Sequence, residues 1–79
     1  MDPKLVIAEI LETAFKLSME KDKIKEIFEK SGVTISDNKA VGVNGDSMDV
    51  LKQLMTNLSA MAVIKISAKQ IIRKAGLNL

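Results

Sequence analysis

The sequence predicts an α+β domain dominated by about four helices, with one small β-hairpin. Two observations support this prediction. Apolar residues recur every three or four positions before residue 32 and after residue 46, as on the buried face of a helix. Between these parts, residues 33–43 are rich in valine and isoleucine and are interrupted by Asp37-Asn38-Lys39, a pattern typical of two strands and a turn. An all-α bundle, with an irregular connection over 33–43, is the alternative.

The first predicted helix covers residues 3–20. Asp2 can accept hydrogen bonds from the first backbone N–H groups, and Pro3 suits the first helical position because its missing N–H would have no partner there. The apolar stripe of this helix is broader than a single partner helix would cover. Its members are Val6, Ile7, Ile10, Leu11, Ala14 and Leu17, widened by Leu5, Ala8 and Phe15.

The second predicted helix is shorter and covers residues 22–31, with Asp22 as its expected cap. Its apolar face is narrow, and charged residues cover the other sides. Gly32 follows the last turn and can adopt the left-handed conformation that ends a helix. Val33 can then pack back on Phe28, as this kind of helix stop requires.

The predicted hairpin at 33–43 has two registers to choose from. A three-residue loop pairs Ile35 with Val41 and Val33 with Val43, which places all four apolar side chains on one face. A two-residue loop pairs Ile35 with Ala40 and scatters the apolar set. The pattern therefore favours the three-residue loop.

Two further helices are predicted at 47–63 and 67–75. Asn44-Gly45 is expected to form a turn, and Asp46 or Ser47 is expected to cap the third helix. The apolar stripe of this helix continues for about four turns before a charged residue interrupts it.

A break between these two helices is expected within one residue of Lys65, where the sequence becomes rich in β-branched residues. Ser67, followed three residues later by Gln70, fits the capping box of a helix start. Residues 62–66 could then form a short third strand. One continuous helix over 47–75 is the alternative.

We expect a single small domain over residues 1–79, either alone or as one part of a longer chain. No disulfide can stabilise it, because cysteine is absent. No apolar run approaches the roughly 20 residues that a membrane span needs. The first residues also lack the basic and apolar regions of a signal peptide. We therefore expect a cytoplasmic protein with no membrane partner.

The residue types argue against catalysis. Histidine, cysteine and tyrosine are all absent, which removes the commonest general base and the imidazole and thiolate metal ligands, and leaves Asp, Glu, Lys, Ser and Thr as the reactive side chains. Asp37, Asp46 and Asp49 could hold a divalent cation only if they converged in space, and their spacing matches no calcium-binding loop. We expect no enzyme activity, no metal, no cofactor and no small-molecule substrate.

The apolar content favours association with protein. Hydrophobic residues make up 47% of the chain, which is more than a small monomer hides easily. We therefore expect a homodimer formed through the apolar faces of the first and third helices, with a tightly packed monomer as the alternative. The expected contact residues are Ile7, Leu11, Phe15, Leu51, Met55 and Leu58.

The basic residues near the end of the chain suggest a second kind of partner. From Lys52 onward every charged side chain is positive. Side chains four residues apart share one face of a helix and can contact successive phosphates. A nucleic-acid-binding module is therefore the alternative function. Its expected phosphate contacts are Lys65, Lys69, Arg73 and Lys74.

Overall fold

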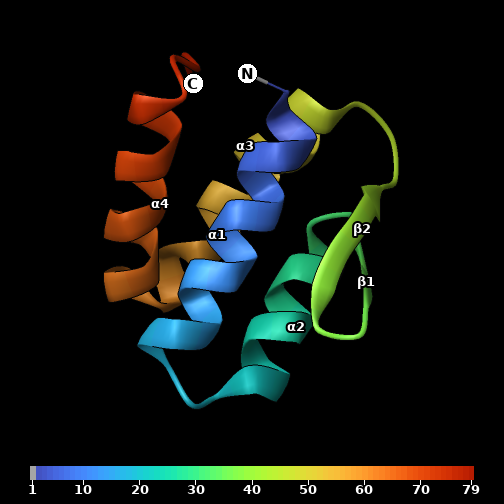
Figure 1. The fold of residues 1–79 in the computed structure, drawn as a ribbon, viewed down its shortest axis with the longest axis vertical. Coiled ribbons are helices and arrows are strands. Elements are labelled where there is room, and N and C mark those ends of the chain that lie inside the picture. Colours follow the sequence, from blue (N-terminus) through green and yellow to red (C-terminus); the bar gives the residue numbers. More distant parts are fainter. Residues whose placement is uncertain (1) are drawn as a thin grey trace.

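The computed structural model describes residues 2–79, which fold into four α-helices, one short 3-10 helix and a two-stranded antiparallel sheet (Figure 1). The α+β class, the helix-dominated content and the hairpin are therefore confirmed, and the all-α bundle is not adopted. The elements are α1 (Pro3–Leu17), α2 (Lys21–Lys30), β1 (Val33–Ser36), β2 (Lys39–Val43), α3 (Ser47–Asn57), η1 (Leu58–Ala60) and α4 (Ala62–Lys74).

The α1 helix lies in the middle of the molecule, with α4 on one side and α2 and the hairpin on the other (Figure 1). Asp2 caps it as predicted, because its Oδ1 accepts a hydrogen bond from the Lys4 backbone N–H at 3.0 Å. Its broad apolar stripe packs against α2, α3, α4 and β2. The five stripe residues nearest the centre are no more than 1% exposed, and they are Val6, Ile7, Ile10, Leu11 and Ala14.

Both N-terminal helices differ slightly from their predicted bounds. The α1 helix ends at Leu17 rather than at residue 20, because Ser18 is extended and its Oγ accepts a hydrogen bond from the Glu20 backbone N–H. The α2 helix starts directly afterwards at Lys21. Asp22 therefore lies inside the first turn of α2 and does not cap it, so that prediction was wrong.

The end of α2 follows the predicted chemistry. Gly32 has a φ of +104° and donates its N–H to the Glu29 carbonyl at 3.1 Å. Next to it, the hydroxyl of the buried Ser31 donates to the Ile27 carbonyl at 2.8 Å and accepts from the Asn57 side-chain amide at 2.9 Å. Asn57 is the last residue of α3. This pair of hydrogen bonds therefore joins the ends of α2 and α3.

The hairpin is present, but its register combines the two that were considered. Val33 pairs with Val43 as predicted, whereas Ile35 pairs with Ala40. The turn has two residues, Asp37 and Asn38, with φ values of 52° and 62°, which aspartate and asparagine adopt readily in a hairpin turn. The predicted three-residue loop was wrong. A bulge at Val41 absorbs the difference between the registers, and this side chain is exposed.

The chain does break between α3 and α4, but earlier than predicted. Asp46 caps α3 as expected, since its Oδ2 accepts from the Asp49 backbone N–H at 3.1 Å. The helix then ends at Asn57 and passes through η1 to Met61, which has non-helical dihedral angles (φ −132°, ψ 80°). The predicted helix 47–63 was therefore too long, and the continuous helix 47–75 does not form.

The β-branched stretch after this break is helical. The α4 helix starts at Ala62, so the predicted strand over 62–66 and the predicted helix start at Ser67 were both wrong. Burial explains the difference, because the helical conformation places Ile64, Ala68 and Ile72 on one buried face. Packing on α1 outweighs the weak strand preference of the β-branched residues.

The end of α4 repeats the stop seen after α2. Gly76 has a φ of +75°, and its N–H donates to the Arg73 carbonyl at 3.1 Å. The Leu77 N–H reaches back to the Ile72 carbonyl at 3.2 Å. These two hydrogen bonds form a Schellman motif, in which the side chains of Leu77 and Ile72 are expected to come together. Leu77 is partly buried against the core.

Replacing Gly32 with alanine is expected to lower the free energy of unfolding by about 2–4 kcal/mol. The left-handed backbone disfavours any side chain by about 1–2 kcal/mol, and crowding adds to this. The new Cβ would lie 3.1 Å from Val50 Cγ2. Gly76→Ala is the matched control, because Gly76 also has a positive φ but its Cβ would have open space. Urea denaturation measures both, and an equal loss in the two variants would show that crowding at Gly32 contributes nothing.

Candidate functional site

The six residues expected to contact a second copy lie largely inside the core of a single chain. Ile7, Leu11, Leu51 and Leu58 are at most 1% exposed, and Met55 is also buried. Phe15 is half-buried, and its ring lies 5.8 Å from the Lys21 ammonium. The apolar faces of α1 and α3 therefore pack within the domain. Of the six, Phe15 and Met55 still line concave surfaces, so most of any surface for a second copy has to come from other residues.

Exposed apolar side chains gather instead at the end of the molecule where α1 finishes and α4 begins. The side chains of Leu17 and Val63 line the same shallow cavity, of about 280 Å³, together with Met61. Met19 is 97% exposed and follows Leu17 by two residues. Ile66 is exposed one helical turn after Val63. We call Leu17, Met19, Val63 and Ile66 the end patch.

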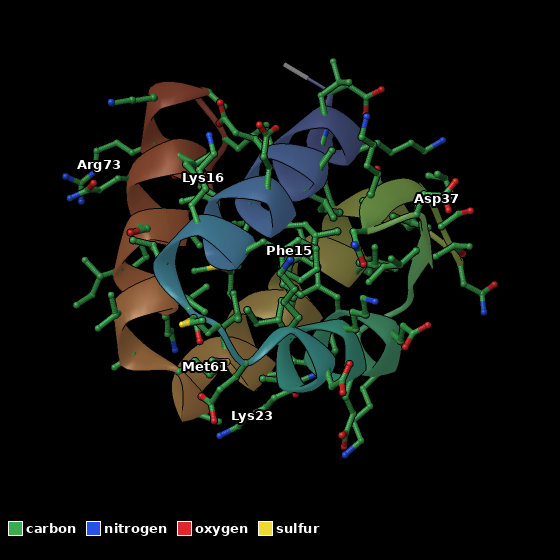
Figure 2. The ribbon with its side chains drawn as sticks, turned by 60° about the horizontal axis from the view of Figure 1, so that its bottom comes forward. Phe15, Lys16, Lys23, Asp37, Met61 and Arg73 are labelled. Atoms are coloured by element: carbon green, nitrogen blue, oxygen red, sulfur yellow. The ribbon has the colours of Figure 1, made fainter. Side chains whose placement is uncertain are left out.

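Charges of both signs border the end patch. Glu20 and Lys23 line the same cavity as Leu17 and Val63. Figure 2, which brings this end of the molecule forward, shows Met61 and Lys23 on the same side. The surface therefore combines an apolar centre with one acidic and one basic neighbour.

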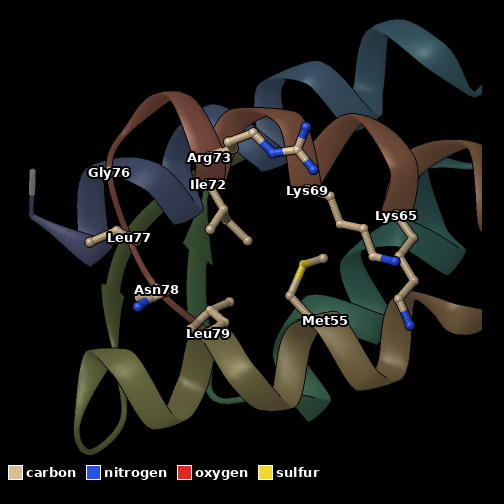
Figure 3. Close-up of a pocket in the computed structure, with 9 residues that line it drawn as sticks. All are labelled: Met55, Lys65, Lys69, Ile72, Arg73, Gly76, Leu77, Asn78 and Leu79. Carbon is tan, nitrogen blue, oxygen red and sulfur yellow. The ribbon is translucent and has the colours of Figure 1, made fainter.

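A larger concavity, of about 630 Å³, lies between α3 and α4, and we call it the basic groove. Its apolar lining consists of Met55 from α3, Ile72 from α4, and Leu77 and Leu79 from the segment after α4. Figure 3 shows Met55 and Ile72 pointing into the space between the two helices. The segment from Gly76 to Leu79 runs from the end of α4 toward α3 and bounds one end of the groove.

Three of the four predicted phosphate contacts line this groove. Lys65, Lys69 and Arg73 are four residues apart, so they form a row along one side of α4 (Figure 3). Lys74 does not line the groove, because a shift of one residue rotates a side chain by about 100° around the helix axis. Lys69 and Arg73 therefore share a groove-lining face of α4, Lys65 lies on the same face, and Lys74 lies outside it.

The row of cations has no carboxylate partner among residues 2–79. The two ion pairs there, Lys16 with Glu12 and Lys30 with Glu26, lie within α1 and α2 at 3.6 Å each. The Lys65 ammonium donates to the neutral Ser59 hydroxyl at 2.7 Å. The positive charge along the groove is therefore available to an anionic ligand.

The three aspartates considered for a cation do not form such a site. Across residues 2–79, no group of three or more acidic side chains is placed to hold a metal ion. Asp46 serves as the cap of α3, and Asp37 occupies the hairpin turn. A third concavity, of about 520 Å³, lies between α1 and the hairpin turn. The end patch and the basic groove differ from it by their exposed apolar side chains and by their row of cations, respectively.

Sequence reasoning missed the end patch because it placed the break in the wrong position. With a strand over 62–66, Val63 and Ile66 have no defined helix face. Once α4 starts at Ala62, these two residues are three positions apart and lie away from the buried face formed by Ile64 and Ala68. The sequence therefore contains a sign of the end patch, namely two apolar residues on the otherwise polar side of α4. This sign can be recognised only when the start of α4 is placed correctly.

Comparisons with family models, with curated proteins and with solved structures found no match for this chain. No helix within residues 2–79 has both the length and the apolar character needed to cross a membrane.

Replacing Leu51 with alanine is expected to lower the free energy of unfolding by about 2–5 kcal/mol, because a fully buried leucine leaves a cavity. Leu5→Ala is the control, since Leu5 is exposed and lies outside the end patch, so its loss should change stability by no more than about 0.5 kcal/mol. Urea denaturation measures both. A Leu51→Ala variant of unchanged stability, but of altered oligomeric mass, would contradict the core position of Leu51.

Proposed function

We propose that this is a non-catalytic protein-interaction domain of the cytoplasm that forms a homodimer through the end patch. The observation that carries the proposal is that the exposed side chains of Leu17 and Val63 line one cavity, with two further exposed apolar residues, Met19 and Ile66, two and three positions away along the chain. Contiguous exposed apolar surface of this kind marks association sites more often than isolated apolar residues do. The absence of histidine, cysteine and tyrosine supports a binding role over catalysis.

The charges around the end patch suit a two-fold dimer. In such a dimer the same surface faces itself, so residue i of one copy meets residue j of the other and the reverse. Glu20 and Lys23 lie beside the same cavity and carry opposite charges. A two-fold axis through the patch can therefore bring each glutamate near the lysine of the second copy. The basic groove lacks this property, because a row of like charges repels its own copy.

The small size of the chain also favours this proposal. A domain of 79 residues exposes a large share of its surface and has no disulfide to stabilise it. Burying Leu17, Met19, Val63 and Ile66 would remove apolar area from water, at roughly 25 cal/mol per Å². Dimer formation would thus add to the stability that the core of each chain provides.

Introducing a charge at Val63 is expected to abolish the dimer. Light scattering after size exclusion should give about twice the 8.6 kDa chain mass for the wild type and the chain mass for Val63→Glu. Val41→Glu is the matched control, because Val41 is 62% exposed and Val63 is 65% exposed, but Val41 lies on the hairpin. A mass of 8.6 kDa for the wild type up to about millimolar concentration would refute the proposal. Equal loss of the dimer in both variants would exclude the end patch as its specific site.

Reversing one charge beside the end patch should weaken the dimer, and reversing both should restore it. Glu20→Lys and Lys23→Glu each place like charges together across the two-fold axis, so we expect a dimer dissociation constant about two- to fivefold larger, as for a solvent-exposed pair. The double variant restores opposite charges. Analytical ultracentrifugation measures the three constants, and a double variant weaker than either single variant would contradict the two-fold arrangement.

A further inference from the structure

We propose that the basic groove binds an acidic amphipathic helix from a partner protein. The groove lies between α3 and α4 and is separate from the end patch, so this proposal does not depend on the dimer. Two properties of the groove define its ligand. Its floor is apolar, and its charge is positive and confined to the α4 side.

The shape of the groove comes from the way α3 and α4 are held. Both helices pack on α1, but their backbones hardly approach each other. Met55 and Ile72 therefore form the bottom of a trough rather than a closed helix–helix contact (Figure 3). An amphipathic helix that docks in a groove uses apolar side chains at positions i, i+3, i+4 and i+7, which would cover such a floor.

The charge row sets the polarity of the ligand. Lys65, Lys69 and Arg73 span two helical turns, or about 12 Å along α4. A ligand helix that lies along α4 and carries carboxylates four residues apart on one edge would match this spacing. On the α3 side the groove is lined by the uncharged Met55. The edge of the ligand helix that faces α3 therefore needs no charged residue.

A helix of a second copy does not fit this requirement. The exposed face of α2 mixes Lys23 and Lys30 with Glu26 and Glu29, so its carboxylates are accompanied by lysines that the cations of the groove would repel. The helices α1, α3 and α4 each pack their apolar faces inside the domain. The groove therefore selects a partner of different, acidic composition.

Nucleic acid matches the groove less well. Phosphates could contact the row of cations, but the backbone would leave the apolar floor uncovered. Single strands bind mainly by stacking bases on aromatic side chains, and no aromatic residue lines the groove. An acidic helix satisfies both the charge and the apolar floor.

The test uses a fluorescein-labelled peptide about four turns long, with leucines on one face and glutamates every fourth residue along one edge of that face. Fluorescence anisotropy with the whole chain is expected to give a micromolar Kd that rises with salt. Arg73→Glu should raise the Kd at least about tenfold, because it places a carboxylate among those of the ligand. Lys74→Glu changes the charge equally at the next residue but lies outside the groove, so it should raise the Kd by less than about threefold.

Two further probes separate charge from the apolar floor. Leu77→Ala should weaken peptide binding about three- to tenfold, with circular dichroism confirming that the variant is folded. A peptide with the same residues in scrambled order should bind at least about tenfold more weakly. Equal effects of Arg73→Glu and Lys74→Glu, or equal binding of the scrambled peptide, would overturn the proposal. Tighter binding of a DNA duplex than of the peptide, unaffected by Leu77→Ala, would also overturn it in favour of phosphate recognition.

Discussion

The burial of one broad face of α1 is the constraint on which the rest of the structure depends. Five residues of this helix are at most 1% exposed, because α2, α3, α4 and β2 all pack against it. A helix surrounded in this way needs an apolar face wider than a coiled-coil seam. The 47% hydrophobic content of the chain is therefore used mainly inside one domain, and only a limited set of large apolar residues stays exposed.

Much of the fold could be predicted because local chemistry determines where several elements start and stop. Asp2 and Asp46 cap their helices through short side-chain hydrogen bonds, and Gly32 and Gly76 end theirs with positive φ. These features depend on neighbours a few residues away, so a single sequence contains them. The hairpin register was half predicted, since Asp37 and Asn38 allow a tight turn and a bulge at Val41 keeps Val33 opposite Val43.

The position of the break between α3 and α4 could not be predicted, because no local signal marks it. Neither glycine nor proline occurs between Asn57 and Lys65. The turn at Met61 forms because Leu58 and Ile64 are both buried in the same core, on either side of the reversal. The burial of the candidate contact residues on α1 and α3 within one chain could not be predicted for a related reason. Periodicity shows that a face is apolar, but it does not show whether the same chain or a second one covers it.

The same break explains why both candidate surfaces involve α4. If residues 47–75 formed one helix, Met55 and Ile72 would lie about 25 Å apart along its axis, at 1.5 Å per residue. The reversal at Met61 instead brings α4 back alongside α3, so the two residues share the floor of one groove. The turn also leaves the first residues of α4 near the end of α1, where Val63 and Leu17 line one cavity. The reversal at Met61 thus gives α4 a part in two different surfaces. One is apolar with balanced charge and suits a second copy, and the other is basic and suits an acidic partner.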